Sequence, residues 1–199
     1  MRRQLLAVLA AVLLAASAAV AALADGGWSR RTLAAAGVSI AAPAGWLNVS
    51  SAGEDRSLAL TTRLDPALAP YVQLARSSGA LKLLLLAPAG FPNMSVTETL
   101  SPGLSLAQVV HLNVLATRSL PFVGAISSSL VTLPAGRAVR LRYTIALAGS
   151  KLTETQYLLL RLGRLYVLSY TGSAGAAALL ASLASRSAAS LRFLGRPIA

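Results

Sequence analysis

Hydrophobic and polar residues alternate along several stretches of this chain, and alternation with a period of two predicts β-strands. The clearest stretch spans residues 139–147, where apolar residues occupy the odd positions and Arg140, Arg142 and Thr144 occupy even ones. Because successive side chains of a strand point to opposite faces, this pattern places the two arginines together, away from the apolar residues. Residues 38–42 and 58–64 alternate in the same way.

Leucine occupies every position from 83 to 86, without polar alternation. A short apolar run of this kind is typical of a strand that is covered on both faces. Residues 153–161 and 165–170 form two further strand-like stretches, and short glycine-containing turns separate them from 139–147 and from each other. We therefore expect three consecutive antiparallel strands, in a sheet with helices on both faces.

Two stretches have the pattern of amphipathic helices. Ser105 and Gln108 form a capping-box motif at the start of the first, which we place at 105–118. Ser173 is the candidate N-cap of the second, which we expect to end near Arg192 and Phe193. The leucines that we expect on one face of this helix are Leu179, Leu180, Leu183 and Leu191.

Residues 165–185 contain no charged side chain, so a second membrane-spanning segment has to be considered there. Gly172 and Gly175 argue against it, because they indicate a turn in its middle. The free N–H groups of a helix that follows these glycines could hold an anion, but the stretch lacks the lysine of a phosphate-binding loop. Simple helix capping explains it better.

The N-terminus has the layout of an export signal. Arg2 and Arg3 precede an apolar stretch that ends in small residues, and this predicts cleavage after Ala24. An uncleaved anchor and a twin-arginine signal are the alternatives, since about 20 apolar residues can span a bilayer. We divide the chain into a signal peptide at 1–24, a lead-in at 25–36 and a single domain at 37–195.

Composition adds a strongly basic charge balance to this picture. The 199 residues are 55% hydrophobic and 12% charged, with a net charge of +12, no cysteine and one histidine. The lack of cysteine excludes disulfides, thiolate metal sites and a lipid-modified N-terminal cysteine. Removal of residues 1–24 lowers the charge of +12 by two, to +10. The excess favours an anionic partner such as a protein or an envelope surface, unless the arginines serve only solubility. Nucleic acid is disfavoured because the basic residues are scattered and the chain is predicted to be exported.

Residues for catalysis or metal binding do not form a recognisable set. His111 lies within the first predicted helix and lacks an identifiable nucleophile or acidic partner, so a surface role is the better interpretation. Glu54, Asp55 and Asp65 could contact a cation, but solvation of a loop explains them more simply. We therefore predict no catalytic residue, no metal ligand and no cofactor.

Several short motifs, in their order along the chain, resemble one known group of proteins. They are Gly37-Val38-Ser39-Ile40 with Pro43-Ala44-Gly45-Trp46, the helix after Ser105, Leu133-Pro134-Ala135-Gly136-Arg137-Ala138, Gln156-Tyr157, Tyr166-Val167-Leu168-Ser169-Tyr170, and Ser190-Leu191-Arg192-Phe193. Together they resemble the PsbP/DcrB/LpqN-like superfamily, which also includes a Ran-binding nuclear-import factor. The resemblance implies an α+β fold, an α/β/α sandwich in which helices pack on both faces of an antiparallel sheet. It also implies an interaction role without shared catalytic residues, in exported envelope proteins and in photosystem II accessory proteins.

Three functional hypotheses follow. The first is an exported, periplasmic or envelope-associated, non-catalytic interaction module, with photosystem II accessory protein as a variant implied by the resemblance. The second is a carrier of a lipid or another small hydrophobic ligand, and the third is an enzyme that uses His111 or the scattered acidic residues. For the first, Arg140 and Arg142 are the candidate partner contacts, because two guanidiniums about 7 Å apart on one strand face can bind carboxylates or phosphates. Solvation of the surface by both side chains is the alternative.

Overall fold

The computed structural model describes residues 27–49, 77–88, 92–120, 122–147 and 150–195. The predicted signal peptide at 1–24 and the predicted strand at 58–64 lie outside these residues. The same is true of the acidic residues Glu54, Asp55 and Asp65.

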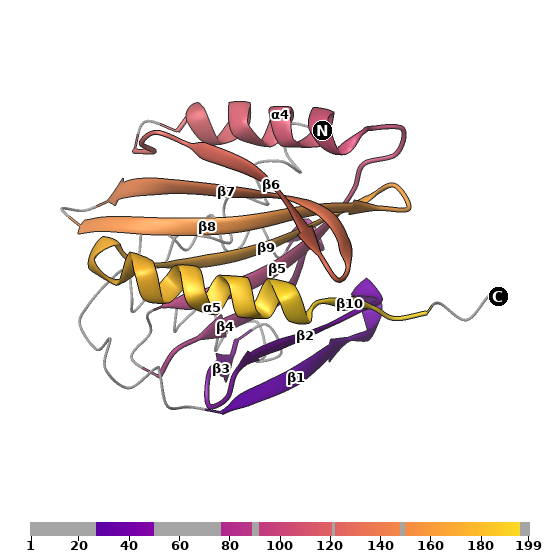
Figure 1. Cartoon of the computed structure of the whole chain (residues 1–199), viewed down its shortest axis with the longest axis horizontal. Coiled ribbons are helices and arrows are strands. Elements are labelled where there is room, and N and C mark those ends of the chain that lie inside the picture. Colours follow the sequence, from indigo (N-terminus) through magenta and orange to yellow (C-terminus); the bar gives the residue numbers. More distant parts are fainter. Residues whose placement is uncertain (1–26, 50–76, 89–91, 121, 148–149, 196–199) are drawn as a thin grey trace.

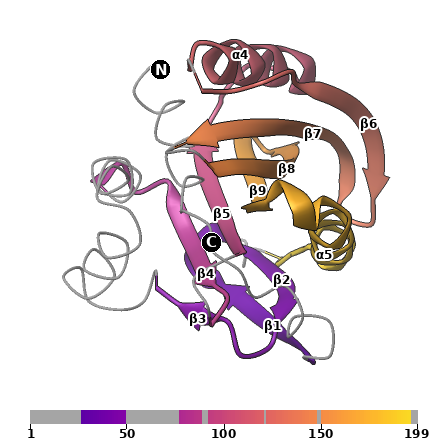
Figure 2. The same cartoon turned by 90° about the vertical axis from the view of Figure 1, so that its left-hand side faces the viewer.

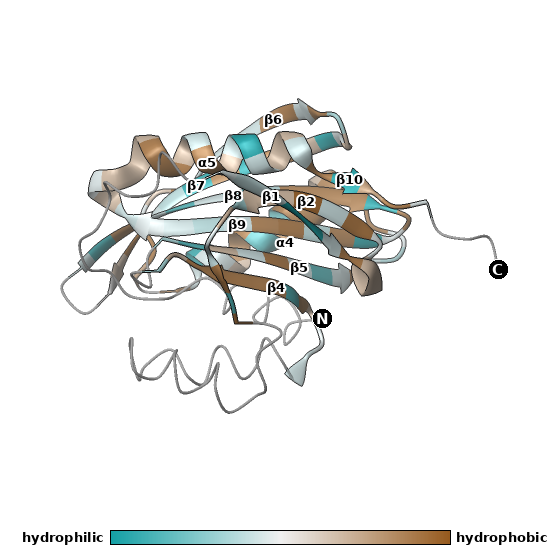
Figure 3. Cartoon of the chain, turned by 90° about the horizontal axis from the view of Figure 1, so that it is seen from below, coloured by the Kyte–Doolittle hydropathy of each residue, from teal (hydrophilic) through white to brown (hydrophobic). Residues whose placement is uncertain are grey.

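Most of the described chain forms a sheet of seven strands in which all neighbours are antiparallel (Figure 1). In spatial order the strands are β3 (Leu47–Asn48), β4 (Leu81–Leu86), β5 (Asn93–Leu100), β9 (Arg164–Ser173), β8 (Ser150–Arg161), β7 (Gly136–Leu147) and β6 (Ser127–Leu133). The predicted trio of consecutive antiparallel strands is confirmed as β7, β8 and β9. Leu83, Leu84, Leu85 and Leu86 of β4 are at most 1% exposed, which confirms a strand covered on both faces. In Figure 3 this strand is hydrophobic along most of its length.

A smaller sheet of three strands adjoins the first and was only partly predicted. It contains β1 (Trp28–Leu33), β2 (Val38–Pro43) and β10 (Arg192–Phe193), with β2 in the middle. Residues 28–36, which we placed in a lead-in before the domain, are part of this sheet, because β1 pairs with the whole of β2 and a short 3-10 helix, Ala34–Ala36, joins them. The polar run of β1 has no clear alternation, so a strand is only weakly indicated by its residues.

Two α-helices cover opposite faces of the large sheet, as predicted (Figure 2). The first, α4 (Leu106–Arg118), packs Val109 against Leu158 of β8. The second, α5 (Ala177–Ser190), packs Leu183 in the same cluster as Tyr157 of β8, whose side chain points the other way. The α+β class and the antiparallel sheet with helices on both faces are thus confirmed. The capping box of α4 is also present, with Ser105 and Gln108 bonded to each other's backbone N–H.

The boundaries of the last helix differ from the prediction. Ser173 ends β9 and makes no capping hydrogen bond, and a 3-10 turn, Ala174–Ala176, precedes α5. The helix stops at Ser190 because the next residues pair with β2, where Arg192 lies opposite Ser39. Gly172 does not form a turn but lies inside β9, so the turn falls after it. No helix of the described residues is long and apolar enough to cross a bilayer.

Candidate interaction site

The two arginines singled out from the sequence lie side by side on β7. Each arginine lies opposite a serine of the edge strand β6: Arg140 is opposite Ser129, and Arg142 is opposite Ser127. On the other side Arg140 lies opposite Tyr157 of β8, on the sheet face that α5 covers in part. The structure therefore puts both arginines on one face, as the alternation predicted, and opposite to the buried Leu141.

Both guanidinium groups are available to an external ligand. Arg142 is exposed and Arg140 is half-buried. Among the described residues, neither guanidinium makes a hydrogen bond or an ion pair. Helix α5 packs mainly on β2, β8 and β9, and the exposure of Arg142 shows that this end of the face is open.

The acidic residues of the described chain do not offset this basic charge at the surface. They are Glu98 and Glu154. Glu98 of β5 is buried between two cations, with Lys82 Nζ at 3.8 Å and an ion pair to Arg164 Nη1. Its carboxylate is thus already shared by two basic side chains.

Glu154 of β8 is fully buried, and burial raises the pKa of its carboxyl to about 8. The neighbouring polar groups of Gln156, Tyr143 and Ser169 offset only part of this rise. Gln156 Nε2 donates to Glu154 Oε1 at 2.6 Å. At pH 7 the carboxyl is therefore mostly protonated, and it adds little negative charge to the molecule.

Glu154 belongs to a buried polar cluster that was not predicted from the sequence. The cluster forms two cross-strand rows on the α4 side of the sheet: Asn93, Thr171, Glu154 and Tyr143 in one row, and Ser95, Ser169 and Gln156 in the other. All seven are at most 3% exposed. Glu154 Oε2, Gln156 Oε1 and both amide atoms of Asn93 have no hydrogen-bond partner among the described residues. The polar residues on both faces of 153–156 were the available signal, since a half-buried strand would alternate.

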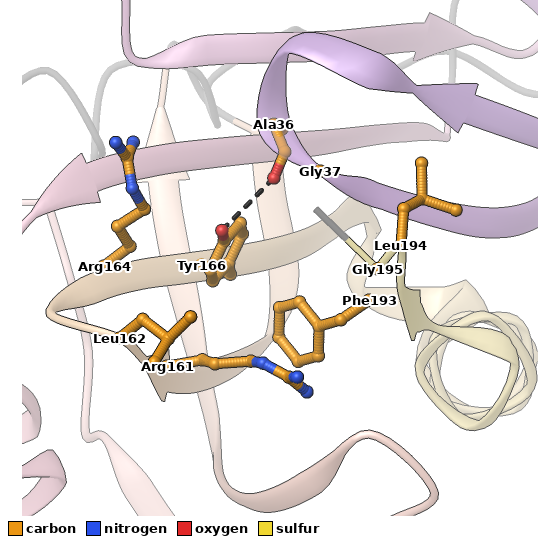
Figure 4. A pocket seen from close by; sticks show the side chains of 9 residues that line it. All are labelled: Ala36, Gly37, Arg161, Leu162, Arg164, Tyr166, Phe193, Leu194 and Gly195. Atoms are coloured by element: carbon orange, nitrogen blue, oxygen red, sulfur yellow. Dashed lines mark hydrogen bonds between the residues drawn. The ribbon is translucent and has the colours of Figure 1, made fainter. Parts of the chain in front are cut away.

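A second feature is a small hollow at the β8–β9 turn, shown in Figure 4. It has a volume of about 90 Å³ and an aromatic wall, in which the rings of Tyr166 and Phe193 meet edge to face at 5.1 Å. Arg161 lies over the Phe193 ring at 4.4 Å, and the Tyr166 hydroxyl donates to the carbonyl of Ala36 at 3.2 Å. The cation–π contact and the ring pair thus fix the end of the chain at β10 against β8 and β9.

Leu162 at this turn has an unfavourable backbone. Its φ is +49°, in the left-handed region, and its side chain is 84% exposed. This conformation costs most side chains about 1–2 kcal/mol, whereas asparagine tolerates it because its short polar side chain can bond to the nearby backbone, so we expect Leu162→Asn to stabilise the protein by about 1 kcal/mol. Chemical denaturation of both proteins measures this difference.

Leu130→Asn is the matched control for that prediction. Leu130 is also exposed, at 59%, but it lies in β6 with an ordinary strand backbone. The same substitution there should bring no gain. Equal effects at the two positions would show that the backbone of residue 162 is not the cause.

The remaining candidate residues from the sequence do not come together in a common site among the described residues. His111 is an exposed residue of α4. The residues that the structure describes contain no group of three or more histidine, cysteine, aspartate or glutamate side chains that could hold a metal ion. The Gly172–Gly175 segment is split between β9 and a 3-10 turn, so it does not form a glycine-rich loop before a helix.

Comparison with known proteins shows the fold. Neither a family model nor a curated protein sequence matches the chain. Among solved structures, it is similar to cyanobacterial PsbP from Synechocystis sp. PCC 6803, with a TM-score of 0.56 and 11% identity, over 89% of this chain and 98% of that one. It is also similar to the Ran-binding protein Mog1p of Saccharomyces cerevisiae, with a TM-score of 0.56 and 10% identity, over 85% and 97% of the two chains.

A third similar structure is LpqN of Mycobacterium tuberculosis, which is involved in cell envelope biogenesis. Its TM-score is 0.51 and its identity 13%, over 86% of each chain. The chain therefore has the PsbP-like fold, as the resemblance in its sequence implied. At these identities the likeness is one of fold, and function has to be argued from the site.

Proposed function

We propose that this protein is an exported, non-catalytic accessory module of the cell envelope that docks on an anionic partner. The similar structures include a Ran-binding protein and a protein involved in cell envelope biogenesis, which supports an interaction role. Export is supported by the signal-like sequence of residues 1–24.

The state of the two described acids is the observation on which the anionic partner rests. One carboxylate is shared by Lys82 and Arg164, and the other is buried and mostly protonated at pH 7. Arg140 and Arg142 have no acidic partner among the described residues. A surface with unpaired cations on a chain of net charge +12 attracts anions over about 8–10 Å in physiological salt.

Salt-dependent binding tests this function. We expect the purified full chain to bind poly-glutamate and phosphatidylglycerol vesicles, and to bind each about tenfold more weakly when salt is raised from low to physiological concentration. Poly-lysine and phosphatidylcholine vesicles are the controls of opposite and zero charge. Equal binding to all four, or binding that salt does not change, would contradict an electrostatic docking function.

A further inference from the structure

The strand β6 is an open edge of the large sheet (Figure 2). It pairs with β7 along one side over seven residues, from Ser127 opposite Arg142 to Leu133 opposite Gly136. Among the described residues no strand pairs with its other side. Charged side chains and prolines usually prevent pairing at an exposed edge. The sequence of β6, SSSLVTL, contains neither.

The side chains along this edge leave room for an added strand. Ser128, Leu130 and Thr132 are exposed, so the face of β6 on the α4 side is open. On the other face Val131 and Leu133 pack against the core, and the open part is the end with the exposed Ser127 and the half-buried Ser129. Exposed edges with β-branched and small residues accept extended peptides, which gain main-chain hydrogen bonds from the edge strand. The backbone of β6 therefore supplies binding that does not depend on the sequence of the partner.

The arginines of β7 supply the selectivity. Arg140 and Arg142 lie one strand inward from the edge, and the residues between them and the edge are Ser129 and Ser127. Neighbouring strands are about 4.8 Å apart, so an added strand would lie about 10 Å from β7. A serine is too short to obstruct an arginine that extends across it. Both guanidiniums can therefore reach side chains on one face of an added strand.

The charge expected of the added strand follows from the charge of this chain. Two copies would each bring a net charge of +12, and the described residues offer no free carboxylate to face the arginines of a second copy. An acidic segment of a different protein is complementary. Because Arg140 and Arg142 are two residues apart, their carboxylates would also be two residues apart. Leu130 lies on the opposite face and is 59% exposed, which favours an apolar residue beside the acidic pair.

We propose that β6 binds an extended acidic segment of a partner protein as an eighth strand of the sheet, with Arg140 and Arg142 binding carboxylates at alternate positions of that segment. This inference rests on the proposed anionic docking and gives it a site and a partner class. The pattern expected in the partner is acid-x-acid with a neighbouring apolar residue, inside a stretch of about seven residues that can be extended.

Two synthetic peptides test the strand addition. The first is an acetylated and amidated nine-residue peptide that alternates aspartate with valine, and the second has the same sequence with N-methyl groups on alternate backbone nitrogens. We expect the full chain to bind the first peptide and to bind the second at least about tenfold more weakly, because N-methylation removes the ladder donors without changing charge. In the complex, the backbone amides of Ser127–Leu133 should gain protection from hydrogen exchange.

Matched arginine variants test the site. Arg140→Gln with Arg142→Gln should weaken binding of the first peptide by about tenfold or more. Arg118→Gln with Arg137→Gln removes the same charge from α4 and from the other face of β7, and it should leave most of the affinity. The folding of each variant is checked by its thermal unfolding curve.

The outcomes separate this inference from the proposed function. Equal affinity for both peptides, or equal loss in the two double variants, would overturn strand addition at β6 and leave anionic docking in place. Failure of the chain to bind the acidic peptide, poly-glutamate and anionic vesicles alike would overturn both. Protection of amides in another strand would place the partner elsewhere and overturn the assignment to β6.

Discussion

Replacing the buried Glu154 by glutamine should remove a large part of the pH dependence of stability. In the folded protein this carboxyl has a pKa of about 8, while its ordinary value is 4.5. Between these values the unfolded chain binds fewer protons than the folded one, so stability falls as pH rises from about 4.5 to 8. When the pH rises from 4 to 7, we expect the free energy of unfolding of the wild-type protein to fall by about 3 kcal/mol more than that of Glu154→Gln. Urea denaturation at several pH values measures both curves.

Glu98→Gln is the control for this prediction. It makes the same chemical change at a carboxylate that is bound by Arg164 and lies near Lys82. The steep fall of stability between pH 4.5 and 8 should remain in that variant. Parallel pH curves for the wild type and Glu154→Gln would mean that Glu154 is ionised in the folded protein at neutral pH, and the surface would then be less basic than we infer.

The buried acid also bears on function. A carboxyl that keeps its proton at pH 7 cannot neutralise the arginines through long-range attraction, and Glu98 is already paired. Above pH 8, Glu154 would ionise and oppose the basic surface from inside the sheet. Anionic docking and stability should therefore both be greater at neutral pH than at pH 9.

Alternation and apolar runs were sufficient to predict four strands of the large sheet, β4, β7, β8 and β9, but they did not predict β5 or β6. The pattern at 139–147 and the leucines at 83–86 are found as β7 and β4, and the capping-box residue Ser105 begins α4 as expected. These elements have one-sided or wholly apolar burial, so local sequence and tertiary environment favour the same structure. The positions of Arg140 and Arg142 on one face followed from the same period of two.

Other features depend on contacts between distant parts of the chain and could not be predicted locally. β1 is a strand because it pairs with β2, and Phe193 leaves the helical pattern because β10 pairs with that same strand. The buried polar cluster forms only when β5, β8 and β9 are in register. Polar residues on both faces of 153–156 are a local sign of the cluster, but the burial of its members depends on the tertiary structure.

Gly172 is a further residue whose role follows from a distant contact. We interpreted it as a turn, but it lies in β9 beneath α5. A Cβ built at this glycine would be 2.8 Å from Leu180 Cδ1 and 3.1 Å from Pro92 Cβ. The lack of a side chain is therefore what allows the helix to approach the sheet.

Gly172→Val should consequently destabilise the protein by about 2 kcal/mol, because the added side chain overfills a closed contact in the core. Valine suits a strand backbone, so the loss would come from the clash alone. Gly175→Val is the control, since no atom lies within 4 Å of a Cβ built there.

Leu180→Ala destabilises the protein by itself, because Leu180 is 1% exposed. It also frees the space that the side chain added by Gly172→Val would need. In a double-mutant cycle measured by chemical denaturation, the combined variant should lose clearly less unfolding free energy than the sum of the losses in the two single variants. Additive losses would show that Leu180 does not set the approach of α5 to β9.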